Sequence, residues 1–154
     1  MVSLAPATSD NWRDIARVRA TERQHAWVAD VTYYLCVSAF EGLCHSCAVI
    51  DDGATVGHVM WAVDPVDDTH WIGGLVIDSR RQGNGVGRAT VQALLVLWEE
   101  QEPSLSGTPY TQAALSVAPG NEVARGLYHS LGFAETGEMS DGELVMRRPR
   151  TLPG

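Results

Sequence analysis

Residues 75–94 constrain the fold of this chain more than any other segment. An apolar, mostly β-branched run from Leu75 to Ile77 stops at Asp78, and a glycine-rich turn follows over residues 82–87. A long apolar segment with helical character then covers residues 86–98. Glycines let a backbone approach a ligand closely, and unpaired N–H groups at a helix start face an anion. The segment therefore predicts a strand, a turn and a helix arranged to hold a diphosphate.

Three known loops are candidates for this turn. A nucleotide P-loop needs Gly-Lys followed by Ser or Thr, whereas Arg88 follows the last glycine here, so that interpretation fails. A dinucleotide-binding fold needs G-x-G-x-x-G near its first strand, and these glycines have another spacing and lie mid-chain. The pattern Gln/Arg-x-x-Gly-x-Gly/Ala is matched by Gln82, Gly85 and Gly87. This third loop resembles the acetyl-CoA pyrophosphate loop of the GCN5-related N-acetyltransferases (GNAT). An ordinary glycine turn before a core helix is the alternative.

Length and composition predict one globular domain. The chain has 154 residues, 45% of them hydrophobic, which suffices for a real core. We expect the domain to span residues 1–148 and residues 149–154 to form a tail. The first residues lack a basic segment ahead of an apolar run, so no signal peptide is expected. The longest apolar run, residues 93–98, is too short to span a membrane, and we expect a cytoplasmic protein.

The net charge is −8 at pH 7, with a pI near 4.9. Nucleic acids and anionic membranes attract basic patches, so neither is an expected partner. An acidic surface would attract a cationic substrate, although solubility alone can also explain it.

The three cysteines do not predict a metal site. Cys44 and Cys47 have the spacing of half a zinc site, but no second Cys/His pair would complete four ligands. In a strand the two side chains face opposite sides. We interpret Cys36, Cys44 and Cys47 as buried thiols in a reducing cytosol, and we expect no metal.

Hydrophobic periodicity and turn residues predict the order β-α-α-β-β-β-α-β-α-β-β, a mixed α/β sheet with helices on both faces. The first helix would be capped by Ser9 or Asp10, and the second would follow a capping box at Thr21, carry Trp27 and end near Gly42. Further helices are expected over residues 86–101 and 121–131. Strands are expected over residues 47–50, 55–63, 71–77, 113–117, 133–138 and 143–147.

A second motif lies in the strand–helix segment 115–133. It matches Val-x-x-x-Asn-x-x-Ala-x-x-Leu-Tyr-x-x-x-Gly-Phe through Val117, Asn121, Tyr128 and Phe133. With the first loop, in this order and separation, the segment resembles the GNAT family over roughly residues 44–148. The resemblance implies a mostly antiparallel, twisted sheet of about seven strands, splayed between the fourth and fifth.

The same resemblance implies roles for single residues. The backbone of Val76 and Ile77 would pair with the pantetheine arm of acetyl-CoA and direct the acetyl carbonyl. Asn121 would hydrogen-bond the arm, and Tyr128 would protonate the leaving thiolate. The pyrophosphate would be held by the loop residues Gln82, Gly83, Asn84, Gly85, Val86, Gly87 and Arg88.

Tyr128 also has a purely structural interpretation. It lies on the same expected helix side as Val123, Ala124 and Leu131, so it could be a core aromatic residue. A positioned phenol that donates to a thiolate in an apolar cleft is the chemical alternative, which the family pattern favours.

Several details resemble the polyamine-acetylating branch of the family, among them residues 23–29, 71–78 and 127–147. The sequence departs from that branch at Gly73 and Gly74, where a bulky residue and an arginine are expected. Two glycines would widen the cleft or soften the strand, and they offer no acidic base. A polyamine is therefore a hypothesis, and a larger antibiotic or natural-product amine is the alternative.

The acceptor amine must lose a proton before it attacks, because its pKa is near that of lysine. Glu22, Glu41, Asp64 and Glu143 could accept that proton or bind the amine, and the sequence does not rank them. No cysteine lies in either motif, so we expect direct transfer without an acetyl-enzyme. A non-catalytic acyl-CoA-binding module is the remaining alternative. The last hairpin could pair across a two-fold axis, which leaves a homodimer open.

Overall fold

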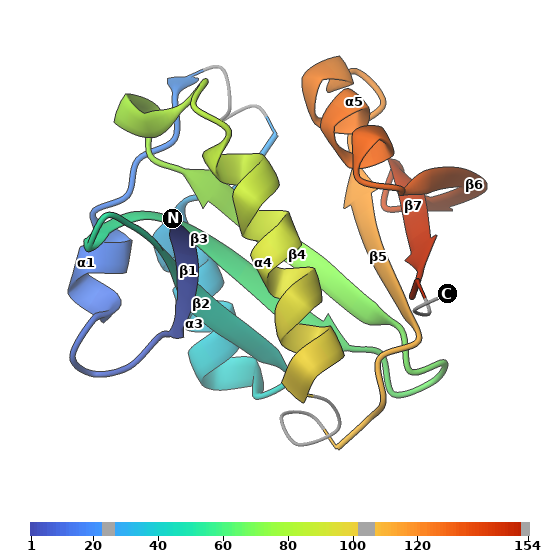
Figure 1. Cartoon of the computed structure of the whole chain (residues 1–154), viewed down its shortest axis with the longest axis horizontal. Coiled ribbons are helices and arrows are strands. Elements are labelled where there is room, and N and C mark those ends of the chain that lie inside the picture. The colour runs from blue at the N-terminus through green and yellow to red at the C-terminus, as the bar shows by residue number, and fades with distance from the viewer. Residues whose placement is uncertain (23–26, 102–106, 152–154) are drawn as a thin grey trace.

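The computed structural model of the chain describes residues 1–22, 27–101 and 107–151. Its strands form one seven-stranded sheet in the order β1-β2-β3-β4-β5-β7-β6 (Figure 1). Only β4 and β5 pair in parallel, so the mixed, mostly antiparallel sheet is confirmed. The strands are β1 (Val2–Pro6), β2 (Cys44–Asp51), β3 (Ala54–Val63), β4 (His70–Ile77), β5 (Gln112–Val117), β6 (Ala134–Ser140) and β7 (Glu143–Pro149).

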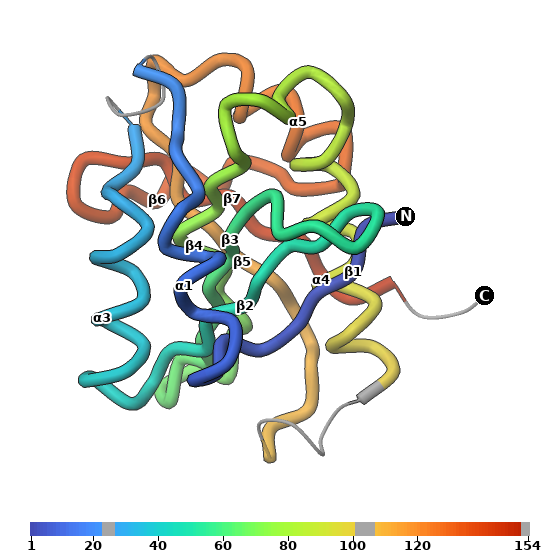
Figure 2. Tube along the Cα trace, turned by 90° about the vertical axis from the view of Figure 1, so that its left-hand side faces the viewer, coloured from blue at the N-terminus to red at the C-terminus, as the bar shows by residue number. Residues whose placement is uncertain are grey.

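Helices cover both faces of the sheet, as expected. Figure 2 shows α1 and α3 on one side and α4 on the other, and α5 lies on the side of α4. Their bounds are α1 (Trp12–Ala16), α3 (Val31–Glu41), α4 (Val86–Gln101) and α5 (Glu122–Ser130). No helix in the described ranges is long and apolar enough to cross a membrane.

The sheet splits between β4 and β5. These strands pair only through His70 with Ala113 and through Trp71 with Ala114, at their first residues. Beyond this point β5 pairs with β7 over its whole length, while β4 pairs with β3. The later half of β4 therefore has a backbone edge that faces a gap, and the expected splay is confirmed.

Each face of the sheet has its own core. Trp98, Leu94 and Leu115 are buried on the side of α4. Ile15 and Val31 pack against Val76 on the side of α1 and α3. Apolar residues alternate between these two cores along the strands, which fixes the register of the sheet.

The first two expected helices differ from the structure in one cap and in continuity. Asp30 begins α3, because its side chain accepts from the Thr32 N–H, and Trp27 precedes the helix in a turn. Asn11, rather than Ser9 or Asp10, precedes α1. Glu22, directly after the expected cap Thr21, is helical, and residues 23–26, which include the end of the expected capping box, lie outside the described residues. The C-terminal prediction for α3 is confirmed, since Gly42 has φ +75.

The prediction of three buried thiols is wrong for Cys36. This residue of α3 is exposed, whereas Cys44 is half-buried and Cys47 is buried in the sheet. Near-continuous apolar sequence in α3 hid which side faces outward. At the C-terminus, β7 runs to Pro149 and the Arg150 N–H donates to the Thr111 carbonyl. The sheet thus extends into the segment expected to be a tail.

Candidate active site

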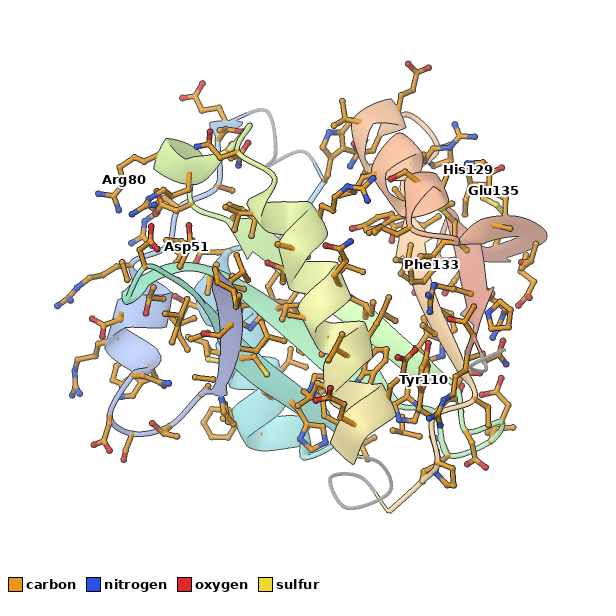
Figure 3. All side chains as sticks on the ribbon, viewed as in Figure 1. Asp51, Arg80, Tyr110, His129, Phe133 and Glu135 are labelled. Carbon is orange, nitrogen blue, oxygen red and sulfur yellow. The ribbon has the colours of Figure 1, made fainter. Side chains whose placement is uncertain are left out.

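The strand end at β4 is held by a buried carboxylate. Asp78 follows β4, its N–H donates to the Val56 carbonyl, and its side chain accepts from the backbone and guanidinium of Arg80. The hydrogen bond from Arg80 is the main reason why the pKa of Asp78 is lowered. Asp78 also accepts from the Arg19 N–H at 3.3 Å, which ties the loop to the segment after α1. Arg80 itself points outward (Figure 3).

The glycine turn leads directly into α4. Gly83 and Gly85 have φ of +81° and +76°, and a Cβ at either position would meet open space. Asn84 between them is exposed. The Ala89 N–H bonds to the Gly85 carbonyl, so the N–H groups of the first helical residues lack intrahelical partners. The loop is therefore an open cradle of N–H donors at the positive end of a 16-residue helix.

The start of α4 lies across the gap from α5. A Cβ at Gly87 would lie 3.9 Å from both Ile77 and Leu127. The Arg88 guanidinium donates to the Ser130 hydroxyl at the end of α5. Arg88 thus bridges two elements that flank the gap, and in this arrangement its guanidinium is engaged with α5.

The backbone of β4 divides into groups that face β3 and groups that face the gap. The bond from the Asp78 N–H to the Val56 carbonyl fixes the antiparallel alternation, so Val76 faces His58 in the next hydrogen-bonded pair. The backbone of Ile77 then points away from β3, and its carbonyl accepts from Gln82 Nε2 at 3.0 Å. Of the two β4 residues expected to contact the pantetheine arm, Ile77 presents its backbone to the gap.

Asn121 and Tyr128 belong to α5. Asn121 is the N-cap of this helix, and its side-chain oxygen accepts from the Ala124 N–H at 3.3 Å. Tyr128 is half-buried, packs against the core that holds Leu94 and Trp98 of α4, and meets Phe133 edge-on at 6.1 Å. Burial raises the pKa of Tyr128 to about 12. Val123 is 83% exposed, so its expected place on the buried side of α5 is wrong.

On the opposite side of the sheet, Glu143 borders the splay. It begins β7, is half-buried, and accepts from the Ser116 hydroxyl of β5 at 3.0 Å. Burial raises the pKa of Tyr34 on α3, and the charge of Glu143 adds to that rise. The Glu143 carboxylate is therefore hydrogen-bonded to β5, and its charge also acts on the Tyr34 phenol of α3.

A sequence model of the acetyltransferase (GNAT) family matches residues 9–133. This chain belongs to the GNAT acetyltransferase family. No curated protein matches the sequence significantly. The aminoglycoside acetyltransferase AAC(6')-Ib, in complex with coenzyme A and kanamycin, is 20% identical with a TM-score of 0.74, and the match covers 97% of this chain and 95% of that one.

Two further GNAT structures share the fold. The ribosomal-protein-S18-alanine N-acetyltransferase from Escherichia coli is 20% identical, with a TM-score of 0.69 and coverage of 100% of this chain and 97% of that one. The spermidine N-acetyltransferase from Vibrio cholerae, in complex with CoA and spermine, is 17% identical, with a TM-score of 0.68 and coverage of 95% and 92%. At these identities the likeness establishes the fold of this GNAT domain.

Among the four candidate acids, Glu143 is the one whose charge acts on Tyr34 of α3. Glu41 is the last residue of α3. It lies ten residues after Val31, the first residue, which is about 15 Å along the helix axis. Asp64 follows β3, where its carboxylate accepts from the Val66 N–H and its charge helps to raise the pKa of Arg147. Glu22 is exposed and borders a segment outside the described residues.

Sequence reasoning missed His58 and the residues around it. His58 is fully buried in β3, with Nε2 2.9 Å from the Ser46 hydroxyl and Nδ1 2.6 Å from the Gly74 carbonyl. The Ser46 hydroxyl lies 2.7 Å from the Ser38 hydroxyl of α3. The sequence did contain a signal for this group, because a histidine inside an otherwise apolar strand is expected to be buried. A buried imidazole needs hydrogen-bond partners.

The described part of the chain contains no cluster of three His, Cys, Asp or Glu side chains suited to a metal. A cavity of about 890 Å³ lies among α1, the later half of α3, the start of β2 and Leu97 of α4. None of its lining residues belongs to the glycine turn, β4 or α5. The candidate active site of this GNAT domain is therefore the splay, and the cavity is separate from it.

Proposed function

We propose that this protein is an acetyl-CoA-dependent N-acetyltransferase acting on a primary amine of a small cationic substrate. The observation that carries the proposal is the β4–β5 gap, which lies between an open glycine cradle at α4 and the buried phenol of Tyr128. Family membership supports the same reaction class. We propose one cytoplasmic domain that includes the whole of β7, to Pro149, consistent with three free thiols.

The residues at the gap suit acetyl-CoA, which supplies the activated acetyl group. The pyrophosphate would be bound by the N–H groups of Gly83, Gly85 and the first turn of α4, where the helix dipole favours negative charge. The Ile77 backbone would pair with the pantetheine arm, and the Asn121 amide would donate to it while its oxygen caps α5.

Tyr128 would stabilise the departing thiolate. The phenol is protonated at neutral pH and can donate a hydrogen bond, and burial, which raises its pKa to about 12, disfavours its ionisation further. A thiolate formed in an apolar cleft without a donor would be costly. We propose direct attack by the amine while both substrates are bound, with no acetyl-enzyme.

Glu143 is our proposed amine-binding residue and proton acceptor, directly or through a water. Its contacts with Ser116 and its position near Tyr34 support this choice over Glu22, Glu41 and Asp64. A half-buried carboxylate interacts more strongly with a cation than one in bulk water.

We propose a linear polyamine as the first substrate class, because its charges match this acidic side of the gap. A bulky polycationic amine, such as an aminoglycoside, is the second candidate. A Cβ at Gly73 of β4 would meet only Met60 Cε, at 3.8 Å, so this position leaves room for a wide acceptor. The spermine and kanamycin complexes of the structural neighbours agree with both classes.

The test is CoA-thiol release from acetyl-CoA with spermidine, spermine, putrescine, aminoglycosides, a lysine peptide and chloramphenicol. Saturable release with linear polyamines that weakens as salt rises supports the first class. Release with aminoglycosides alone supports the second. Gly73→Leu, which fills the space at this position, should then reduce kcat/KM for the aminoglycoside more than for putrescine. Tight acetyl-CoA binding without release from any amine would contradict the proposed activity and favour a binding module.

A further inference from the structure

The backbone of β4 is irregular where it borders the gap. In the pairing with β3, Met60 faces Gly73 and His58 faces Val76, so Gly74 and Leu75 together oppose one residue, Val59. This is a β-bulge, and Gly74 takes its left-handed position with φ +55. A bulge changes the direction of the backbone groups around it. This bulge can therefore affect which backbone groups of β4 face the gap.

A hydrogen bond from the His58 side chain stabilises the bulge. The Gly74 carbonyl can only accept, so the 2.6 Å contact requires a hydrogen on Nδ1 of His58. In a neutral ring Nε2 must then accept, and Ser46 donates to it across 2.9 Å. Ser38 donates in turn to Ser46 at 2.7 Å, which gives every group in this chain a partner. Burial lowers the pKa of His58 to about 4, so the ring is neutral at pH 7.

Packing prevents the bulge from relaxing. The Tyr34 ring stacks on His58 at 5.7 Å with an interplanar angle of 10°. A Cβ at Gly74 would lie 3.0 Å from Tyr34 Cγ and 3.1 Å from His58 Cε1. Gly74 therefore fits tightly between two rings, and its peptide has little freedom to rotate.

A trans peptide is planar, so its C=O and N–H point in opposite directions. When the Gly74 carbonyl is fixed on His58, the N–H of Leu75 is directed away from α3. Leu75 lies beyond the last residue of β4 that pairs with β5, in the segment that borders the gap. One side-chain hydrogen bond thus determines the direction of one backbone donor at the site.

We propose that His58 is a positioning residue, which orients the Leu75 N–H as a hydrogen-bond donor to the thioester carbonyl of acetyl-CoA. This inference rests on the proposed acetyl transfer. Negative charge develops on that carbonyl oxygen during attack, and a pre-oriented donor stabilises it without reorganisation. Ser46 and Ser38 act through His58 by fixing its tautomer.

Two carboxamide substitutions of His58 distinguish a role in positioning the bulge from a role in core packing. His58→Asn keeps an N–H donor near the place of Nδ1 and so retains the bond to Gly74. His58→Gln keeps a polar group near the place of Nε2 for Ser46 but loses the donor to Gly74. We expect kcat to fall about 10- to 100-fold in His58→Gln and less than about 3-fold in His58→Asn. The affinity of both variants for CoA should be unchanged. Equal losses in both variants, or no loss in His58→Gln, would overturn the proposal.

A second readout does not depend on turnover. In amide NMR spectra, the Leu75 resonance should respond differently to acetyl-CoA and to CoA in the wild type and in His58→Asn. In His58→Gln this difference should disappear. A wild-type Leu75 amide that does not distinguish acetyl-CoA from CoA would refute the positioning role. Failure of every amine to release thiol would instead refute the proposed activity, so the two failures are distinguishable.

Discussion

Stability at mildly acidic pH should depend on the protonation of His58. Burial lowers the pKa of this imidazole from 6.5 to about 4, against a smaller opposing effect of its bond to Gly74. Between these values the unfolded chain binds a proton that the native chain does not. Stability is therefore complete above about pH 6.5 and declines as the pH falls toward 4.

The size of this effect follows from the two pKa values. The difference is about 2.5 pH units, and each unit corresponds to about 1.36 kcal/mol. At pH 4.5 the wild type should have lost about 2–3 kcal/mol through this group alone. His58→Asn cannot take up that proton, so its stability should fall less over the same range.

The assay is urea unfolding followed by circular dichroism at pH 7.5 and pH 4.5, for the wild type and His58→Asn. All other groups titrate in both proteins, so the difference between the two pH dependences isolates His58. We expect that difference to be about 2–3 kcal/mol. A difference below about 0.5 kcal/mol would show that the buried imidazole titrates normally and would refute the reasoning.

Three further predictions concern the site and the thiols. Tyr128→Phe should lower kcat about 10²–10⁴-fold with CoA affinity unchanged, measured by thiol release, and a change under about 3-fold would mean that Tyr128 only packs. Glu143→Gln should raise KM for a cationic amine about 10-fold, whereas Glu41→Gln, the matched control at the far end of α3, should not; equal effects would contradict the assignment. Cys36 should react with a maleimide at pH 7 before Cys47, which is buried and whose pKa is raised to about 11. Peptide mass spectrometry after brief labelling would reveal the opposite order.

Much of the fold follows from local sequence signals. Residues 86–101 form a helix with the bounds that the sequence predicts, because the apolar segment begins directly after the glycine turn. Asp52 and Gly53 have φ of +50 and +78, as a tight hairpin requires, so the turn between β2 and β3 was predictable from Asp-Asp-Gly. Gly132 follows α5 with φ +92, as its position predicts.

Local sequence patterns gave wrong predictions where tertiary contacts determine the extent of a helix or the side of it that is buried. The sequence predicts one helix from Thr21 to near Gly42, but Trp27 lies in a turn and α3 starts after Asp30. The exposure of Cys36 depends on which side of α3 meets the sheet, and a helix with apolar residues all round does not specify that side.

The sequence by itself determined the glycine turn, the order of elements and the motif around Asn121 and Tyr128, because each depends on neighbours within a few turns of the chain. The tertiary structure alone decided which acid borders the gap and what holds the bulge at Gly74. His58 meets Gly74 across 16 residues, and Ser116 meets Glu143 across 27. Contacts of that range depend on strand register and on the split between β4 and β5, which no local pattern of residues encodes.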